Sequence, residues 1–278
     1  MIFVKLKGGM GNQMFQYALG RAMSLRYGVD LRLDTSFFYL DYKTITKRSY
    51  SLDVFNIKAK TFTINKFITY IISFFRKIIK NKGVEKSFQF DKEVFSFGPN
   101  VYLDGYWQSP KYFVGYEDVI RKDFTLKNPL KQNIKNLMDE IKSKNSICVH
   151  VRRGDYVGNK NHEVVDGEYY KKAIDYISKI KNIEKIYVFS DDIKWCKGNI
   201  FFEFETMFVG EAYSGDKSEG HLFLMSACKD FIIPNSSFSW WAAWLSTSND
   251  KIVVIPQKWF PDESINTNDL IPENWIKI

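Results

Sequence analysis

The sequence predicts an α/β protein built from two doubly wound parallel sheets, and three features of the chain point to this fold class. A strand, a glycine-rich loop, a helix and a second strand follow one another within residues 2–33. Short apolar strands alternate with helices from residue 146 onward, a pattern typical of parallel sheets covered on both faces. A polar, lysine-rich helix candidate at residues 127–144 lies between these two regions and marks the boundary between them.

The first region begins with the apolar strand Ile2–Leu6, which leads into glycine-rich residues 8–11. From Gln13 to Arg26 the apolar residues recur every three or four positions, which is the spacing of one helix face. Gly28 is a suitable stop for this helix, and Val29–Leu33 is predicted as the next strand. A β–loop–α–β unit therefore opens the chain.

The second region alternates more regularly. The expected strands are Ser146–Val151, Lys185–Phe189, Phe231–Ile233 and Lys251–Ile255. The expected helices are Tyr169–Lys181, Glu219–Cys228 and Phe238–Leu245. We accordingly predict a first domain at residues 1–140 and a second at residues 141–278.

The apolar segment Phe67–Lys80, with basic residues toward its end and at Lys82, has two interpretations. It is either a core helix of the first domain or an amphipathic helix at residues 67–82 that touches an anionic membrane peripherally. No apolar stretch reaches the ~18 residues that a transmembrane helix needs.

Composition excludes several classes of protein. With 278 residues, 45% hydrophobic and 26% charged, the chain is globular and long enough for two domains. Its three cysteines are far apart and form no CxxC pair, so neither a zinc site nor a disulfide framework is predicted. This cysteine usage, and an N-terminus without an apolar leader, predict a cytoplasmic protein. The net charge of +8 comes from scattered lysines without a nucleic-acid motif, so we expect no nucleic-acid partner.

Polar side chains cluster where the predicted strands end, which is where open α/β sheets bind ligands. The three strand ends carry His150, Arg152, Arg153 and Asp155, then Asp191 and Asp192, and then Asn235, Ser236, Ser237 and Phe238. Guanidinium groups match phosphate oxygens, and hydroxyls at a helix start favour anions. Together these residues indicate a nucleoside diphosphate ligand.

Each group also has a purely structural interpretation. Arg152 and Arg153 could form a salt bridge with Asp155, and residues 235–237 could cap a helix. The glycine loop does not fit the GxGxxG spacing, and no Walker motif occurs, which disfavours hydride transfer and P-loop chemistry. Asp191-Asp192 is not an Asp-x-Asp motif, so we infer no bound metal.

Four blocks of the sequence resemble the family 11 α-1,2-fucosyltransferases, and in particular their bacterial members. These blocks are Gly8–Ala18, His150–Tyr156, Phe189–Asp192 and Asn235–Trp241. The His-x-Arg-Arg-x-Asp block is shared with α-1,6- and protein O-fucosyltransferases, whereas the first and last blocks narrow the resemblance to the α-1,2 family. The resemblance extends from residue 1 to Trp275.

The resemblance implies a GT-B fold, in which two Rossmann-like domains face each other across a cleft. The first domain would lie on the acceptor side, the second would bind GDP-β-L-fucose, and the tail would pack back on the first. The implied reaction is an inverting transfer of L-fucose to O2 of a galactose-containing glycan or lipid-linked oligosaccharide, in O-antigen or surface glycan synthesis. No metal or other cofactor is expected.

The resemblance also implies roles for individual residues. Arg153 would be the main diphosphate contact, supported by Arg152, while Ser236, Ser237 and Phe238 would touch the phosphates. Asn12 would lie near the reacting centre. Gln13 and Asp34 are further acceptor-side candidates.

Two roles stay open in the sequence. The general base is either Asp155, which could instead pair with Arg152, or a phosphate oxygen of the leaving GDP. Where family members often carry an acidic residue that reads guanine, this chain has His221. Glu219, or Asp191 and Asp192, are the alternatives, and His150 holds either the guanine or the loop, or has only a structural role.

The sequence leaves two rival functions open. One is a glycosyltransferase that uses another nucleotide sugar or forms another linkage. The other is a non-catalytic carbohydrate-binding protein, for which paired arginines at a strand end have no evident use.

Overall fold

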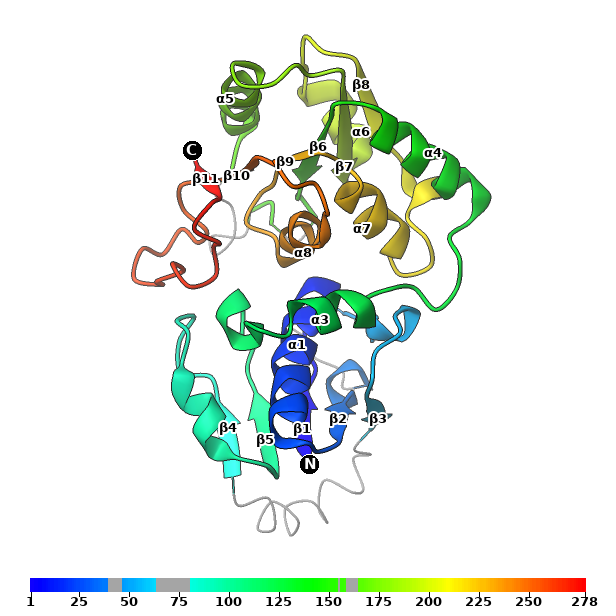
Figure 1. The fold of residues 1–278 in the computed structure, drawn as a ribbon. Coiled ribbons are helices and arrows are strands. Elements are labelled where there is room, and N and C mark those ends of the chain that lie inside the picture. Colours follow the sequence, from blue (N-terminus) through cyan, green and yellow to red (C-terminus); the bar gives the residue numbers. More distant parts are fainter. Residues whose placement is uncertain (40–46, 64–80, 155, 159–164) are drawn as a thin grey trace. The chain divides into compact units, whose positions relative to one another are not determined.

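The computed structural model describes residues 1–39, 47–63, 81–154, 156–158 and 165–278. The chain forms two compact units (Figure 1). The first consists of residues 1–127 and 266–271, and the second of residues 128–265 and 272–278. The first unit thus ends at Lys127, before the boundary that we placed at residue 140, and takes in a short segment of the C-terminal tail.

The first unit contains a five-stranded parallel sheet in the order β3-β2-β1-β5-β4. Its strands are β1 (Ile2–Lys5), β2 (Leu31–Asp34), β3 (Lys60–Phe62), β4 (Asn81–Val84) and β5 (Val101–Asp104). Its α-helices are α1 (Met10–Tyr27) and α3 (Glu117–Asp123), and its 3₁₀ turns are Ser36–Tyr39, Leu52–Val54, Lys92–Phe97 and Pro110–Phe113.

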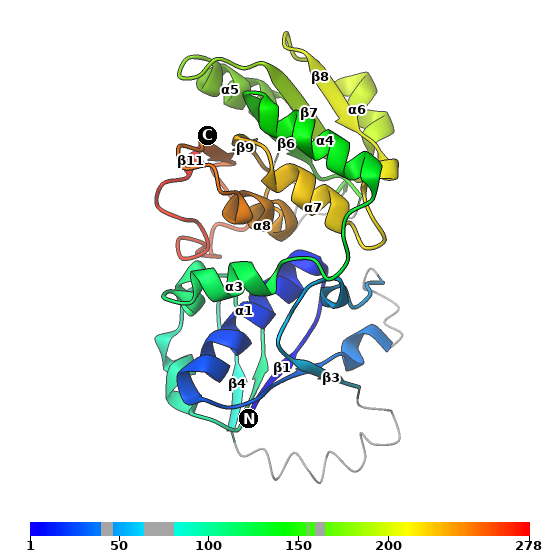
Figure 2. The ribbon, with the colours of Figure 1, turned by 45° about the vertical axis from the view of Figure 1, so that its right-hand side comes forward.

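Helix α1 packs tightly on this sheet because the sequence provides small residues at the contact. A Cβ atom on Gly20 would lie 2.5 Å from Cγ2 of Val4, so only glycine lets the helix approach β1 this closely. The helix ends at Gly28, whose φ of 60° is left-handed and favours glycine. Figure 2 shows α1 lying along one face of the strands.

The second unit contains a six-stranded parallel sheet in the order β11-β10-β9-β6-β7-β8. Its strands are β6 (Ser146–Val151), β7 (Lys185–Ser190), β8 (Thr206–Val209), β9 (Asp230–Ile232), β10 (Val253–Ile255) and β11 (Ile276–Lys277). Its α-helices are α4 (Gln132–Ser143), α5 (Gly167–Ser178), α6 (Ile193–Asn199), α7 (Glu219–Ser226) and α8 (Ser237–Leu245), and Glu211–Tyr213 is a 3₁₀ turn.

Alternate residues of β6 and β7 pack against helices on opposite faces of this sheet. Ile147, Val149 and Val188 share a buried cluster with residues of α5 and α6. On the other face, His150 lies against Phe238 of α8, and α7 packs between α4 and α8 (Figures 1 and 2). Burial on both faces explains why these strands are predominantly apolar.

In each sheet the earlier strands extend from the first strand toward one edge, and the later strands lie on the other side of that first strand. The strand order reverses between β1 and β5 in the first sheet and between β6 and β9 in the second. Ligands of open α/β sheets bind at the carboxyl ends of the strands that flank such a switch point. Each unit therefore presents one edge where a ligand site is expected.

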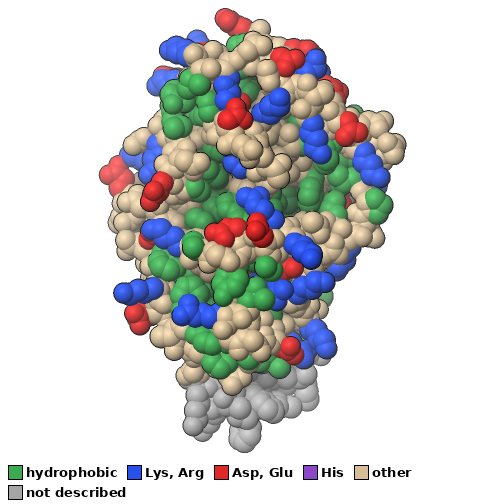
Figure 3. Space-filling model, in the orientation of Figure 1, with side chains coloured by type: hydrophobic (Ala, Val, Ile, Leu, Met, Phe, Trp, Pro, Cys, Tyr) green, Lys and Arg blue, Asp and Glu red, His purple; other side chains and the backbone are tan. Residues whose placement is uncertain are grey.

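Among the described residues, no helix is long and apolar enough to cross a membrane. We left a core helix and a membrane-surface helix open for the segment 67–82. Its residues 67–80 lie outside the described residues, whereas Asn81 and Lys82 belong to strand β4 and not to a helix. Figure 3 shows basic and acidic side chains interspersed on the visible face of each unit, without a broad patch of one sign.

Candidate functional site

The carboxyl edge of the second sheet brings most of the predicted site residues together. They follow three neighbouring strands, with His150, Arg152 and Arg153 at the end of β6, Asp191 and Asp192 after β7, and Ser236, Ser237 and Phe238 after β9. His221 lies on α7, with its ring 5.7 Å from that of Phe189 on β7. Asp155 lies outside the described residues.

Two residues that follow β7 contact the arginines, Asp191 in the connection to α6 and Trp195 in the first turn of α6. Nη1 of Arg152 lies 2.9 Å from Oδ2 of Asp191. The guanidinium carbon of Arg153 lies 3.6 Å from the centroid of the Trp195 ring, so the cation stacks on the indole face. Both arginine side chains are about three-quarters buried, with 22% and 25% of their surface exposed. The pair is therefore preoriented at the sheet edge.

The Nε–H of Arg153 is buried and has no hydrogen-bond acceptor among the described residues. Nε of Arg153 lies 3.5 Å from Oδ2 of Asp192, so the two groups form an ion pair but not a hydrogen bond. A guanidinium has five N–H donors, and buried donors ordinarily have partners. An anion at this edge would supply an acceptor that the described protein lacks.

Asp191 and Asp192 orient the loop and the helix that follow them. Oδ1 of Asp191 accepts from the backbone N–H of Arg153 at 2.9 Å. Asp192 caps α6 by accepting from the backbone N–H of Trp195 at 3.0 Å. A Cβ atom on Gly154 would lie 2.5 Å from Oδ2 of Asp191, so this glycine leaves room for the carboxylate. Both aspartates thus bind protein groups of the edge.

His150 is a buried, neutral histidine. Burial, reinforced by the positive charge of Arg152 and by His221, lowers its pKa to about 3. Its ring lies 6.1 Å from that of Phe238, and no described residue offers a hydrogen-bond partner to its buried Nδ1. Nδ1 can therefore exchange one hydrogen bond with a bound molecule without a change of charge.

His221 and Glu219, two candidates for binding the guanine base, already bind different groups of the protein. Nε2 of His221 lies 3.1 Å from the carbonyl oxygen of Gly210; because a carbonyl only accepts, Nε2 carries the proton. Burial lowers the pKa of His221 as well. The carboxylate of Glu219 accepts from the backbone N–H groups of Asp216 and Lys217, at 3.1 and 2.8 Å, in the turn before α7. Glu219 therefore stabilises the start of its own helix.

Helix α8 begins at the switch point with its first turn toward the sheet edge. Ser236 is the N-cap in an extended conformation, is 5% exposed, and makes no side-chain capping hydrogen bond. The preceding carbonyl, that of Asn235, accepts from the Tyr156 hydroxyl at 2.9 Å and ties the β6 loop to this turn. The first amides of α8 and the hydroxyls around them form a positively polarised end, which favours an anion.

Three predicted residues, Asn12, Gln13 and Asp34, belong to the first unit. Gln13 is fully buried and holds two loops, donating to the carbonyl groups of Gly8 and Ser49 at 3.0 and 2.9 Å. Asp34 is 2% exposed and accepts from the Tyr102 hydroxyl at 2.6 Å. Oδ1 of Asn12 accepts from Nε2 of Gln108 at 2.7 Å.

The sequence reasoning missed Trp195, which forms the platform under Arg153. The sequence feature that could have revealed Trp195 is Asp192, which lies three residues before it and caps a helix that we did not predict. Within the described part of the chain, no group of three or more His, Cys, Asp or Glu side chains is placed to hold a metal ion.

Comparison with known proteins identifies relatives over the full chain. Glycosyl transferase family 11 matches residues 1–278. The chain is 37% identical to the alpha-1,2-colitosyltransferase of Escherichia coli, covering 100% of this chain and 99% of the relative. It is 32% identical to the O-antigen biosynthesis glycosyltransferase WbnK of Escherichia coli, covering 98% and 99% of the two chains. A galactoside 2-alpha-L-fucosyltransferase of Caenorhabditis elegans is 32% identical, over 54% of this chain and 44% of that protein.

Solved structures share the fold at low sequence identity. Fucosyltransferase NodZ from Bradyrhizobium superposes with a TM-score of 0.53 at 16% identity, covering 87% of this chain and 90% of that chain. POFUT1 in complex with GDP-fucose gives a TM-score of 0.50 at 13% identity, covering 91% and 97%. The predicted fold class, two Rossmann-like units of the GT-B type, is confirmed.

Proposed function

The chain belongs to glycosyltransferase family 11, and from this premise we propose that it transfers L-fucose from GDP-β-L-fucose to O2 of a galactose unit. The product would carry an α-1,2 linkage, and the acceptor would be a galactose-containing glycan or lipid-linked oligosaccharide. The observation that carries the proposal is the preoriented pair Arg152 and Arg153 at the β6/β9 switch point, beside the start of α8. An O-antigen role is supported by the name of the WbnK relative.

The edge suits a diphosphate leaving group. As the bond from fucose C1 to the phosphate oxygen breaks, negative charge grows on GDP, and groups fixed in advance stabilise that charge most effectively. Arg153 supplies the main cation, held in place by Trp195, and the amides at the start of α8 supply further donors. Because His150 and His221 are neutral, they contribute hydrogen bonds rather than charge.

The attacking hydroxyl of galactose must lose its proton as it bonds to C1 from the face opposite GDP. Asp155 is one candidate base, and a phosphate oxygen of the departing GDP is the other. Arg152 pairs with Asp191. In the proposed mechanism the proton passes either to the Asp155 carboxylate or to the phosphate oxygen.

One observation favours a second donor. The full-length relative at 37% identity is named an alpha-1,2-colitosyltransferase, and colitose differs from fucose only in lacking the 3-hydroxyl group. The diphosphate site would be the same for GDP-fucose and GDP-colitose. Selection between the two would then depend on a group that reaches the sugar 3-hydroxyl, since a site built to bond a hydroxyl rejects the analogue that lacks it.

Calorimetric titration of GDP, in EDTA and separately with Mg²⁺ or Mn²⁺, tests the donor site. We expect binding in EDTA, weakened about 10- to 100-fold in Arg153→Ala, which corresponds to the ~1.5–3 kcal/mol of a charge-assisted hydrogen bond. Arg153→Lys should recover only part of this affinity, because lysine has neither the planar fork nor the same stacking. Metal-dependent binding, or unchanged affinity in Arg153→Ala, would contradict the assignment.

A donor and acceptor screen then tests the reaction. GDP-fucose, GDP-colitose, GDP-mannose and UDP-galactose would each be incubated with lactose and N-acetyllactosamine, and the product linkage determined by NMR. The proposal expects transfer from GDP-fucose to galactose O2. Faster transfer from GDP-colitose would establish the second donor, and transfer from UDP-galactose alone would reject both.

A further inference from the structure

The carboxyl edge of the second sheet pairs two arginines with two aspartates, and the two pairs differ in how closely they approach. Nη1 of Arg152 lies 2.9 Å from Oδ2 of Asp191, and Oδ1 of the same aspartate accepts from the backbone N–H of Arg153 at 2.9 Å. Nε of Arg153, by contrast, stays 3.5 Å from Oδ2 of Asp192. Asp191 is therefore fully engaged, whereas Asp192 stands beside its arginine without a hydrogen bond to it.

Contacts on both sides hold this gap open. Oδ1 of Asp192 accepts from the backbone N–H of Trp195 at 3.0 Å, and the backbone N–H of Asp192 donates to the Ser190 hydroxyl at 2.9 Å. The guanidinium carbon of Arg153 lies 3.6 Å from the centroid of the Trp195 ring. Closing the gap would therefore strain either the cap of α6 or the stacked pair.

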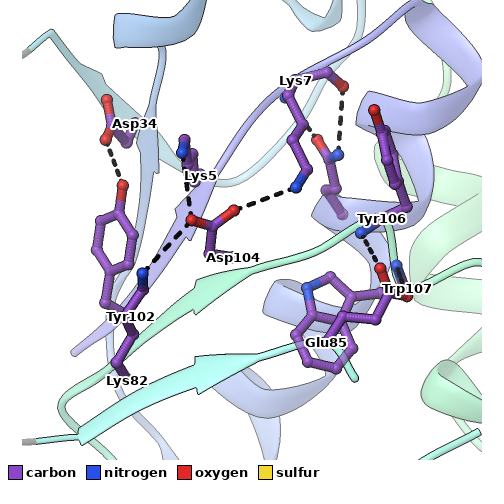
Figure 4. A network of polar contacts seen from close by, with 10 residues as sticks. Lys5, Lys7, Asp34, Lys82, Glu85, Tyr102, Asp104, Tyr106 and Trp107 are labelled. Atoms are coloured by element: carbon purple, nitrogen blue, oxygen red, sulfur yellow. Dashed lines mark hydrogen bonds and ion pairs between the residues drawn. The ribbon is translucent and has the colours of Figure 1, made fainter. Parts of the chain in front are cut away.

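Charged groups around Asp104 in the first unit make closer contacts (Figure 4). Nζ of Lys5 and Nζ of Lys7 each donate to the Asp104 carboxylate at 3.2 Å. Glu85 clamps the loop after β5 with both of its oxygens, which accept from backbone N–H groups at 2.6 and 2.7 Å. In that cluster each carboxylate bonds its donors directly, whereas Oδ2 of Asp192 accepts from no described residue.

The two sides of the gap have opposite effects on an anion. A phosphate oxygen could accept from the buried Nε–H of Arg153, which no described residue bonds. That oxygen would then lie near the Asp192 carboxylate, because the carboxylate is 3.5 Å from the same nitrogen. Two negative groups at one guanidinium edge repel each other. Since 42% of the Asp192 side chain is exposed, water weakens this repulsion without removing it.

We propose that Asp192 sets how fast the nucleoside diphosphate product leaves the site. As a positioning residue it would offset part of the charge of Arg153, weaken the bound complex and so speed the departure of GDP after transfer. Product release limits turnover in many enzymes, so a carboxylate that loosens the product has a use at this position. The inference rests on the proposed function, in which GDP is the product.

Asp192→Asn tests the inference, because this change removes the charge and keeps the cap. Asparagine and aspartate are about equally good N-caps, so α6 should be retained. We expect calorimetry to show GDP bound about 2- to 10-fold more tightly than by wild type, the effect of removing one half-exposed charge. A folding defect would weaken binding, so a gain in affinity cannot come from one. Unchanged or weaker GDP binding would overturn the inference.

The origin of the gain is tested by rates and by salt. The repulsion acts in the bound complex, so stopped-flow displacement of GDP should show the gain mainly as slower dissociation. The gain should also shrink between ~0.1 M and ~1 M NaCl, as the Debye length falls from ~10 to ~3 Å. Faster association with unchanged dissociation, or a gain that salt leaves unaltered, would contradict a role in release.

Asp166→Asn is the matched control. Asp166 is exposed, belongs to the same unit and caps α5 in the same way, accepting from the backbone N–H of Tyr169 at 3.1 Å. Its removal changes the net charge of the chain by the same amount, and GDP affinity should stay at the wild-type value. An equal gain in this control would show a general effect of net charge and overturn the local role of Asp192.

Pyrophosphate, titrated in place of GDP, separates this inference from the proposed function. It presents a diphosphate without base or sugar, so Asp192→Asn should bind it more tightly than wild type even if GDP-fucose proves not to be the donor. GDP binding and fucosyl transfer by wild type, with no gain in the variant, would overturn the inference and leave the proposed function standing. Failure of both proteins to bind GDP and pyrophosphate would overturn both.

Discussion

His150 shows how one side chain can be fixed in a single charge state by its surroundings. Burial, Arg152 and His221 all disfavour the imidazolium, and the pKa falls to about 3. A protonated histidine at this position could also have bound the diphosphate proposed for the site. The structure instead concentrates the positive charge on the two arginines, whose guanidinium groups do not titrate near neutral pH.

This pKa has a consequence for stability at acid pH. Above about pH 6.5 the histidine is neutral in both the folded and the unfolded chain and contributes no pH dependence. Below that pH the unfolded chain binds a proton that folded His150 does not, so the free energy of unfolding falls as the pH drops toward 3. Between pH 6.5 and 5, we expect His150→Gln to reduce the slope of this free energy by up to ~1.4 kcal/mol per pH unit.

Urea unfolding at several pH values measures that slope. His221→Gln should change it in the same direction, because burial lowers the pKa of His221 as well. A slope in His150→Gln equal to that of wild type would show that the imidazole titrates normally in the fold.

The connection after β6 is the element on which the donor site depends. It turns at Gly154, where the Asp191 carboxylate occupies the space that a side chain would need. That carboxylate bonds the Arg152 side chain and the Arg153 backbone. The conformation of the turn and the direction of both arginines are therefore coupled.

Gly154→Ala should displace Asp191 and misorient the arginines. Losing about one or two hydrogen bonds to a charged group predicts GDP binding weaker by roughly 10-fold or more. Gly198→Ala is the matched control, because a Cβ at this glycine of α6 meets nothing within 4 Å. Calorimetry should show unchanged GDP affinity in the control, and equal affinities in both variants would refute the coupling.

At the scale of the whole molecule, the tail contributes to both units. Residues 266–271 belong to the first unit, whereas the residues before and after them belong to the second. Asp269 fixes this segment: its carboxylate accepts from the backbone N–H of Phe90 at 2.9 Å and binds Nζ of Lys111 at 2.6 Å. Lys111 lowers the pKa of Asp269 against the opposing effect of burial.

Asp269→Ala should destabilise the first unit by ~1–3 kcal/mol, because a backbone donor and a lysine lose their acceptor. Differential scanning calorimetry should show a melting temperature lower by several degrees. The rise in melting temperature produced by GDP should persist, since GDP is proposed to bind the second unit. Asp262→Ala is the control, at an exposed aspartate whose carboxylate accepts from the backbone N–H of Ser264 in its local turn. An equal drop in melting temperature in this control would show that Asp269 has no special role in holding the tail.

The sequence by itself determined the central elements and the composition of the donor edge. Strand β6 was predicted with its observed bounds, and α1, α5, α7 and α8 within a few residues, because each has an apolar pattern set by burial. The outer strands β3, β4, β8 and β11 were missed. They are short and lie at sheet edges, so their hydrogen bonds to a neighbouring strand define them rather than any pattern of their own.

Only the tertiary structure decided which side chains became partners. Arg152 pairs with Asp191 on the neighbouring strand, Trp195 supports Arg153, and Glu85 clamps a loop after β5. Strand β5 itself was missed, and with it the cluster around Asp104. The physical reason is the same in each case: a parallel sheet places residues that are far apart in the sequence side by side, and their contacts depend on strand order, which local patterns do not encode.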